Sequence, residues 1–412
     1  MKPQFGTAPG TAAPGRRALP ATADGPQGSR LEAMSDASPQ LLDISSDDPE
    51  ALLDCYAARG WGDGLPMVAP TAERVDAMLA GCDGDEVVAV LPPRSGVATV
   101  RIIAVNAVLA GCRPEHLSVL VAAVRALARP EVNLRGVNAT THPVAPLLVV
   151  HGEAARTGGY NSGLGAFGPG NLANAATGRA LRLVLLHVAG AVPGSGDAST
   201  QGGPAKYAYC VAENLDESPW GGYAASAGVD GPSAVTVHCG EAPHNVHDME
   251  SSHPEPILDK VASTMTTLGS NNAPVSSGEF FVMLCPEHAA ACAAAGWTRG
   301  HVASYLYERA RMRAGDLRDA FALRAWAPWQ EAIGDDAGMA ITEHPENIKV
   351  VVVGGPGKHS CVIPSWGMTR SVTVPVEPQR PSGSTAAPQG RRGAPSEAVA
   401  RAARERSERE RE

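Results

Sequence analysis

The sequence predicts an α/β fold: two related α/β halves packed about a pseudo-twofold crevice, with disordered N- and C-terminal tails. Three observations lead to this prediction. Short runs of branched apolar residues, typical of buried strands, alternate with amphipathic segments of helical period. Aromatic residues make up only 4% of the chain, so we expect cores built mainly from Val, Leu, Ile and Ala. A weak internal repeat relates the two parts of the chain.

Composition divides the 412-residue chain into four parts. Residues 1–38 and 377–412 are poor in large apolar side chains, and we expect both tails to be disordered. The folded region divides near the Gly- and Pro-rich loop that follows His187. This gives a first α/β half over residues 39–190, and a second half with its connecting loop over residues 191–376.

Elements of the first half follow from local signals. Thr71 can cap a helix, Gly111 can end one, and Pro114 can start one. The predicted helices are 49–59, 72–79, 100–110, 115–128 and 172–188, and the predicted strands are 86–91 and 145–150.

The second half shows a similar alternation of elements. Lys206–Ala212 fits a short strand or the apolar body of a helix, and Thr298 can cap a helix. The predicted strands are 233–239, 279–284 and 349–353, and the predicted helices are 256–268, 286–294 and 299–311.

The internal repeat rests on the order of elements. The strand at 86–91, the helix at 100–110, the tripeptide Pro114-Glu115-His116 and the strand at 145–150 have counterparts in the second half. These counterparts are the strand at 233–239, the helix at 256–268, Pro286-Glu287-His288 and the strand at 349–353. The spacing differs between the halves, so duplication is a hypothesis. A duplicated fold would place a ligand in the crevice beyond the carboxyl ends of the strands.

The stretch from Thr140 to His187 is the most distinctive part of the chain. It joins a buried strand to a long Gly/Asn segment and then to a helix. A glycine segment before a helix N-terminus can gather backbone N–H groups around an anion. We therefore expect a substrate-binding loop that includes Asn161, Gly163, Gly170 and Asn171. The alternative is a surface connection that needs glycine only for its turns.

Two cysteines are candidate nucleophiles. Eight cysteines are too sparse for a disulfide framework, so we expect reduced thiols. Cys112 lies between a helix end and Pro114, and Cys210 lies in a segment where Lys206 would favour the thiolate. The alternative is that both cysteines are small buried hydrophobic residues.

Histidines and cations supply further candidates. His142 and His359 lie near the ends of strands in the two halves, and each could act as an acid or base. Arg94, Lys206 and Lys358 lie beside Gly- or Pro-rich loops, as does Arg179, and could bind an anionic substrate. Structural histidines that only form hydrogen bonds are the alternative.

A second group of histidines raises the possibility of a metal site. His238, His244, His247 and His253 fall close together in the sequence, and His288 could join them. Imidazole is a common metal ligand. The segment has no HExxH motif and no paired Cys/His spacing, so a site formed by His238, His244, His247 and His288 is an alternative hypothesis.

Several classes of function are disfavoured. The net charge of −9 and the absence of a basic patch argue against nucleic-acid binding. No apolar run is long enough to cross a bilayer and no secretory signal is present, so we expect a cytoplasmic protein without a membrane partner. GxxxxGK[ST], GxGxxG and GxSxG motifs are absent, and no cofactor can be named. The sequence leaves the formation of a homo-oligomer open.

Several motifs together resemble a little-characterised bacterial family, the UGSC-type (seleno)proteins, in which selenocysteine can replace a cysteine. The motifs are DGLPMVAPT (63–71), AGCRPEH (110–116), THP (141–143), NSG with FGPGN (161–171), GRALRL (178–183), KYAYCVAEN (206–214) and SNN (270–272). The resemblance covers residues 60–370, although no UGSC or CGSC string is present. It implies thiol or selenol redox chemistry, carried here by Cys112 or Cys210.

Three hypotheses follow. The first is an enzyme that uses a reactive cysteine for thiol-dependent redox chemistry on a small anionic substrate, with Lys206 as activator of the thiol and His142 or His359 as proton carrier. The second is a metal-dependent lyase or hydrolase that uses the histidine cluster. The third is a small-molecule binding protein without catalysis.

Overall fold

The computed structural model describes residues 48–275 and 277–377. All of them belong to one compact unit. The longer helices are α2 (Pro49–Arg59), α3 (Ala72–Leu79), α4 (Val100–Ala110), α5 (Leu117–Leu127), α8 (Leu172–Val184), α10 (Pro254–Met265), α12 (Pro286–Ala294) and α13 (Arg299–Arg309). Shorter helices are α6 (Leu134–Ala139), α7 (Glu153–Thr157), α9 (Tyr223–Ser226), α11 (Asn272–Val275), α14 (Ala314–Ala320) and α15 (Pro328–Ala332). Single helical turns are η1 (Pro114–His116), η2 (Pro130–Val132), η3 (Leu185–Ala189), η4 (Pro204–Lys206) and η5 (Pro345–Asn347).

Two four-stranded sheets form the centre of the fold. The first sheet has the order β12-β5-β3-β4, with β12 (Val372–Pro375), β5 (Ser233–Gly240), β3 (Ala145–Gly152) and β4 (Cys210–Ala212). The second has the order β10-β7-β11-β6, with β10 (Ile348–Val352), β7 (Phe280–Leu284), β11 (His359–Pro364) and β6 (His244–His247). In addition, β1 (Val87–Leu91) pairs with β2 (Gly96–Thr99), and β8 (Arg311–Arg313) pairs with β9 (Gly338–Ala340).

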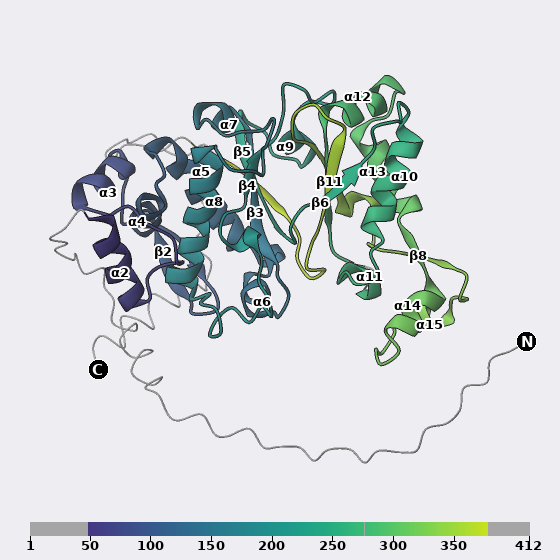
Figure 1. Cartoon of the computed structure of the whole chain (residues 1–412), viewed down its shortest axis with the longest axis horizontal. Helices are drawn as coiled ribbons and strands as arrows, with labels where there is room; N and C mark the ends of the chain where they lie inside the picture. Colours follow the sequence, from purple (N-terminus) through teal and green to yellow (C-terminus); the bar gives the residue numbers. More distant parts are fainter. Residues whose placement is uncertain (1–47, 276, 378–412) are drawn as a thin grey trace, which may run out of the picture. The chain divides into compact units, whose positions relative to one another are not determined.

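Alternating side chains place the sheets in adjacent layers. Leu148 and Val150 of β3 belong to a core shared with α4, α5 and α8, whereas Leu147 and Val149 contact residues of the second sheet. The same alternation occurs in β7, where Val282 packs with α10 and α13 and Phe281 faces the first sheet. The resulting order of layers is helices, sheet, sheet, helices, as the ribbon shows (Figure 1).

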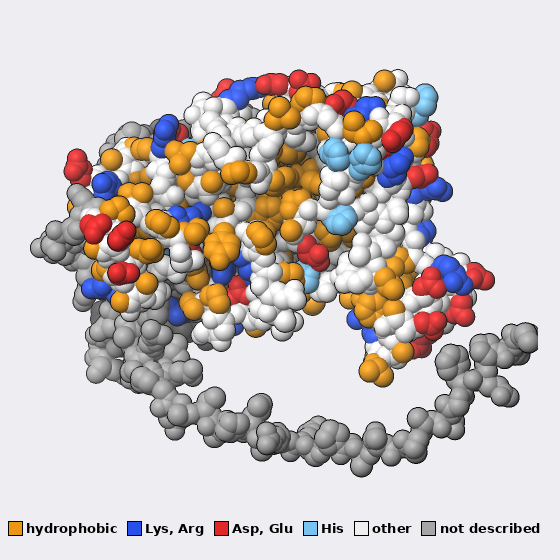
Figure 2. Space-filling view, in the orientation of Figure 1, with side chains coloured by type: hydrophobic (Ala, Val, Ile, Leu, Met, Phe, Trp, Pro, Cys, Tyr) orange, Lys and Arg blue, Asp and Glu red, His pale blue; other side chains and the backbone are white. Residues whose placement is uncertain are grey.

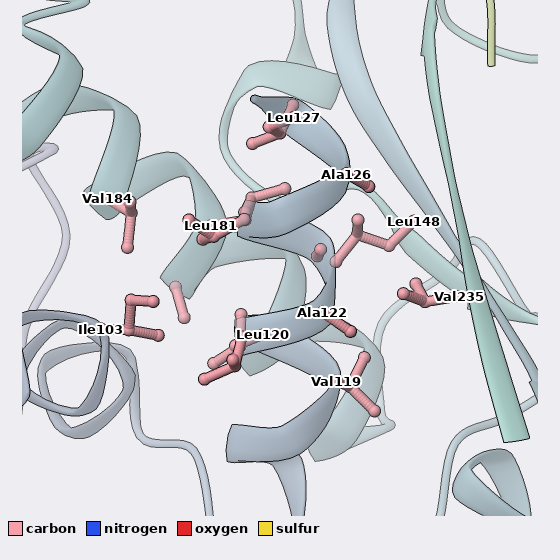
Figure 3. Packing of buried hydrophobic residues seen from close by; sticks show 14 of the residues in the cluster. Ile103, Val119, Leu120, Ala122, Ala126, Leu127, Leu148, Leu181, Val184 and Val235 are labelled. Atoms are coloured by element: carbon pink, nitrogen blue, oxygen red, sulfur yellow. The ribbon is translucent and has the colours of Figure 1, made fainter. Parts of the chain in front are cut away.

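Helix α5 is central to the first helical layer (Figure 3). Leu120 and Leu127 point toward Leu181 of α8, while Ala122 and Ala126 turn toward the sheet. Small residues on one side of α5 allow close approach to the strands, and leucines on the other side fill the wider gap between helices. This packing holds α8 and its N-terminus in place.

Most predicted elements are confirmed, and several coincide with the observed ones residue for residue. Helices α2, α3, α4 and α12 have the predicted bounds, and the observed caps include the side chain of Thr71 at α3. The predicted helix 172–188 ends as α8 at Val184 and continues through η3. Lys206–Ala212 divides into the turn η4 and the strand β4. The mixed α/β class is therefore observed.

The structure bears differently on the predicted tails and on the predicted boundary near residue 190. The tails predicted to be disordered lie outside the described residues, apart from residue 377. The expected division separates β3 from its hydrogen-bonded partners β4 and β5, which follow residue 190. Residues on both sides of that point therefore build the first sheet.

The chain also passes from one sheet to the other between consecutive strands. β5 of the first sheet leads directly into β6 of the second, and β11 of the second sheet is followed by β12 of the first. At the crossing, Gly240 and Ser365 form an isolated bridge, and the Glu241 N–H donates to the Pro364 carbonyl over 2.9 Å. The first sheet is thus completed by β12, which follows all four strands of the second sheet in the chain.

The strands that the internal repeat predicts to be counterparts lie in sheets of different kinds. β1 pairs only with β2 in a two-stranded sheet, whereas its expected counterpart β5 lies inside a four-stranded sheet. The region between the two sheets is filled by apolar side chains that include Leu147, Phe281 and Ile363. The middle of this interface is therefore a packed core.

Candidate functional site

The glycine segment, residues 158–171, connects α7 to α8 and is held by asparagines. Asn174, on the first turn of α8, accepts a hydrogen bond from the Asn161 N–H and donates to the carbonyls of Asn161 and Ala166. Its side chain is buried, so these bonds are shielded from water. Asn174 was not among the predicted site residues, and a second asparagine inside the helix is the only sequence signal that could have indicated it.

The predicted binding residues of this segment take part in its internal hydrogen bonds. Asn161 accepts from the Gly163 N–H and donates to the Leu164 carbonyl. Asn171 caps α8 by accepting from the Asn174 N–H and donates to the Gly159 carbonyl. Gly170 has a φ of 109°, a conformation that favours glycine. The segment is consequently an ordered loop.

An open pocket lies at the N-terminus of α8. This α8 pocket has a volume of about 220 Å³. It is lined by Arg113, Glu115, His116, Thr157, Gly158, Gly159, Asn171, Leu172 and Ala173. The lining therefore combines the start of the glycine segment, the first turn of α8 and the Arg113–His116 turn. Peptide dipoles at a helix N-terminus favour an anion, and Arg113 adds a positive charge while Glu115 opposes it.

His116 forms the inner wall of the α8 pocket. Its Nδ1 accepts from the Arg113 N–H, and its Nε2 lies 3.0 Å from the Gly158 carbonyl oxygen. This arrangement places the proton on Nε2 and fixes the neutral tautomer. Burial lowers the pKa of His116, more than the Gly158 carbonyl raises it. His116 therefore joins the Arg113 turn to the glycine segment.

Cys112 and Cys210 converge behind this wall. Both lie near Tyr160, whose hydroxyl is 2.8 Å from the Thr177 hydroxyl. The Tyr160 ring lies tilted against His116, with 5.4 Å between the ring centroids. Burial raises the pKa of Cys112 to about 12, although a hydrogen bond with Thr177 opposes the shift. The pKa of Cys210 is also raised, first by burial and then by the nearby Cys112. Both thiols are therefore protonated at neutral pH.

Lys206 has a different partner from the one expected. Its Nζ lies 2.7 Å from a carboxylate oxygen of Asp197, to which Arg182 also donates over 3.1 Å. Lys206 is thus an ion-pair partner in η4, and charges on Lys206 do not contribute to the pKa of Cys210. The expected activation of Cys210 by Lys206 is wrong, because the chain turns between η4 and β4.

The other predicted cations lie apart from the α8 pocket. Arg94 packs its side chain against Gly190, and its N–H donates to the Ala189 carbonyl. Arg179 is bound by both carboxylate oxygens of Asp63, over 2.7 and 2.8 Å. Arg179 therefore fixes the extended segment before α3 onto α8.

Lys358 and His359 lie at the turn between β10 and β11. Lys358 donates to the Met249 carbonyl, and His359 Nδ1 is 2.9 Å from the Asn245 side-chain oxygen. The preceding Gly354 N–H donates to the Ser162 carbonyl over 2.7 Å. The turn that leads to Lys358 therefore contacts the glycine segment, but Lys358 and His359 themselves bind elsewhere.

His142 belongs to a separate acid–base pair. Its Nε2 lies 2.9 Å from Glu241, and its Nδ1 accepts from the Val144 N–H. The Glu241 carbonyl accepts from the Tyr209 hydroxyl over 2.7 Å. A carboxylate that orients an imidazole is suited to proton transfer, although His142 is not among the residues that line the α8 pocket.

The histidines of the alternative metal site do not converge. His238 is buried against Phe281, with ring centroids 4.5 Å apart, and His288 is bound to Ser360 and to the Asp248 carbonyl. His244 and His247 begin and end β6, and both are exposed. Within residues 48–275 and 277–377, no group of three or more His, Cys, Asp and Glu side chains is arranged to hold a metal ion. The metal-site hypothesis is therefore wrong for these histidines.

One buried polar network was missed at the sequence level. His151 lies 2.7 Å from Glu213 and 2.8 Å from the Thr236 hydroxyl. Glu213 also accepts from the Tyr223 N–H, and Arg299 of α13 approaches it to 3.7 Å. Thr236 is fully buried, so this network ties α13 to the first sheet and offers no access to a substrate.

On the face in Figure 2, Lys and Arg side chains are scattered among Asp and Glu side chains.

None of the helices in the described part of the chain has the length and apolar character needed to span a membrane. Comparisons of the chain with protein-family models, with curated proteins and with solved structures find no match.

Proposed function

We propose that the protein binds a small anionic molecule in the α8 pocket. The observation that carries this proposal is the convergence of the glycine segment, the α8 N-terminus and Arg113 on one open pocket of about 220 Å³. Backbone N–H groups at the start of a helix bind anions without a dedicated cation, and Arg113 can add a charge-assisted hydrogen bond. The volume suits a ligand with a few carbon atoms and a carboxylate or phosphate group.

A thermal-stability screen tests this binding. Small carboxylates, phosphates and thiol-bearing acids are added one at a time. A ligand is expected to raise the melting temperature, and above its Kd the rise continues with the logarithm of the ligand concentration. Arg113→Met is expected to weaken the effect of the same ligand several-fold. Arg156→Met is the matched control, because Arg156 is exposed and pairs with Asp216.

Two outcomes would contradict the binding proposal. The first is an absence of stabilisation by any small anion in the wild-type protein. The second is an equal response in Arg113→Met and wild type, which would place the ligand outside the α8 pocket.

Thiol-dependent chemistry is a second candidate function, and the meeting of Cys112 and Cys210 at Tyr160 favours it. In this proposal Cys112 is the nucleophile, because it is the less buried of the two and adjoins Arg113. The raised pKa requires that a bound substrate or a change in hydration lowers it before reaction. The resemblance to UGSC-type proteins, with its implied redox chemistry, is part of this proposal.

Alkylation with iodoacetamide separates the two candidates. If Cys112 is a nucleophile, its rate is expected to exceed that of Cys210 and to change when a pocket ligand is bound. Equal and slow modification of both thiols, with and without ligand, would leave binding as the function. Mass spectrometry of peptides that contain each cysteine provides the rates.

We also propose that the two sheets and their helices are related halves of a duplicated fold. In both sheets a parallel pair at one edge, β3 with β4 and β7 with β10, is followed by two antiparallel pairings. The helices α7 and α8 follow β3 as α12 and α13 follow β7. This correspondence supports a pseudo-twofold relation that passes through the strand crossing. Superposition of the two halves in an experimentally determined structure would test it.

A further inference from the structure

A small cavity lies beneath α8, on the side away from its N-terminus. It has a volume of about 10 Å³, which is room for one particle of the size of a water molecule. Most of its wall is apolar, and the polar groups that reach it include Asn138, Arg182 and Lys206. It shares no lining residue with the α8 pocket. The cavity is therefore a separate feature of the fold.

The charges around this cavity do not balance. Arg182 and Lys206 both bind the same carboxylate oxygen of Asp197, over 3.1 and 2.7 Å. Asp63, the other carboxylate that acts on Arg182, is already bound by Nε and Nη2 of Arg179. Three cations therefore face two carboxylates, which leaves one positive charge in excess in a mostly buried place.

The two cations also have hydrogen-bond donors to spare. Arg182 uses Nη2 for Asp197 and for the Ala191 carbonyl, while its Nε and Nη1 donate to no atom of the described residues. Lys206 donates one of its three N–H groups to Asp197. Buried cations are normally paired, because leaving a charge uncompensated in a low-dielectric interior is costly.

We propose that this cavity is a binding site for one small monovalent inorganic anion of halide size, held by Arg182 and Lys206. Such an anion balances the excess positive charge. It also accepts hydrogen bonds from the N–H groups of Arg182 and Lys206 that have no other acceptor. The side chains of Arg182 and Lys206 are flexible at their ends, so the cavity can adjust to an ion slightly larger than water. A water molecule would satisfy the donors but would leave the charge uncompensated.

A comparable ion pair in the second half shows what a balanced arrangement looks like. Asp248 is fully buried and binds a single lysine, Lys260, over 2.8 Å. Its remaining hydrogen bonds come from the backbone N–H groups of Glu250 and Ser251. One cation faces one carboxylate there, and Lys260 provides a matched control.

Thermal unfolding in chloride and in gluconate at equal ionic strength tests the proposal. For the wild-type protein we expect chloride to raise the melting temperature, and above its Kd each tenfold rise in chloride lowers the unfolding constant about tenfold. Bromide-soaked crystals are expected to show an anomalous peak between Arg182 and Lys206. Equal melting temperatures in both salts, or bromide only at other positions, would overturn the proposal and indicate a site for water.

Variants change the charge balance in opposite directions. Lys206→Met removes the excess charge, so we expect the chloride effect to disappear. Asp197→Asn raises the excess, so we expect tighter chloride binding in any folded preparation. Lys260→Met is expected to lose stability but to keep the full chloride effect. A chloride effect that survives in Lys206→Met would contradict the site, and none of these results depends on ligand binding in the α8 pocket.

Discussion

Asn174 shows how one side chain can hold a flexible sequence in a defined shape. As an acceptor it binds the Asn161 N–H, and as a donor it binds the carbonyls of Asn161 and Ala166. Asn174→Asp keeps the acceptor but replaces both donors by a charged oxygen that faces carbonyl groups. We expect a loss of about 2–4 kcal/mol in the free energy of unfolding, because buried polar groups are left unsatisfied. Urea unfolding and proteolysis within residues 158–171 would measure it.

Asn171→Asp is the control for this substitution. Aspartate caps a helix as well as asparagine does, so only the bond to the Gly159 carbonyl is lost. A loss of stability as large as that of Asn174→Asp would show that the two asparagines have the same role, against our expectation.

His238 makes stability depend on pH. Burial lowers its pKa to about 3, and the nearby Ile363 backbone opposes this shift without cancelling it. Since the unfolded chain binds a proton at His238 below about pH 6.5 and the folded protein does not, stability is full above that pH and falls as the pH drops toward 3. Within this window the unfolding free energy is expected to change by about 1.4 kcal/mol per pH unit through His238 alone.

His238→Leu should remove this part of the pH dependence. Its ring nitrogens have no hydrogen-bond partner in the described chain, so an apolar side chain of similar size loses no bond. Urea unfolding between pH 4 and 7 measures the slope. Val237→Ala, in the neighbouring buried position, is expected to lower stability at every pH and to leave the slope as in wild type. An unchanged slope in His238→Leu would refute the assignment.

The sequence predicted helix caps well but predicted poorly which side chains contact one another. Thr71 was expected to cap a helix and caps α3, since capping depends on an N–H only three positions away. Lys206 was expected beside Cys210 but pairs with Asp197, because the turn at η4 redirects the side chain. Contacts of this kind depend on the tertiary fold, which local spacing does not specify.

At the scale of elements, α8 owes its position to a glycine inside the helix. A Cβ at Gly178 would lie 2.5 Å from the Tyr209 backbone nitrogen, in the strand connection beneath it. Alanine normally favours a helix over glycine by about 1 kcal/mol. Gly178→Ala is nevertheless expected to destabilise the protein by about 1–3 kcal/mol, because the helix must move away from the sheet.

Gly300 in α13 provides the matched comparison. The nearest atom to a Cβ at this position is the Thr298 hydroxyl oxygen at 3.8 Å, so alanine fits without a clash. Gly300→Ala is expected to raise the free energy of unfolding by up to about 1 kcal/mol. Thermal unfolding of both variants should therefore give shifts of opposite sign, and shifts of the same sign would disprove the packing argument.

Element boundaries were predictable where the signals are local. Helices such as α3 and α12 begin at a cap or a proline, and these signals lie within the helix sequence itself. The strands β6, β11 and β12 were not predicted, since each is short and gains stability from a distant partner. Their pairing is a property of the folded sheet.

At the scale of the whole molecule, the return of the chain from β11 to β12 couples the two sheets. Val374 of β12 lies opposite the fully buried Val235 of β5 and packs on the first helical layer. Val374→Asp brings a charge to that contact, and we expect a loss of about 2–4 kcal/mol. Both sheets should still unfold together in one transition, because they share the apolar core between them and β12 joins the first sheet only after the chain has formed the second.

Hydrogen exchange followed by mass spectrometry can test this coupling. In Val374→Asp, faster exchange is expected in β5 and also in β7, which pairs with β11 just before β12. The same substitution at Val87, which is 48% exposed in the two-stranded sheet, serves as control and should affect neither. Loss of protection confined to the first sheet would show that the two sheets are energetically independent.

The crossing of the strands also sets a condition on biosynthesis. β12 lies near the end of the described chain, so while the ribosome is still making residues after β5, the outer edge of β5 has no partner. An unpaired apolar edge attracts other strands and invites aggregation. The nascent chain therefore exposes this edge until β12 has been translated.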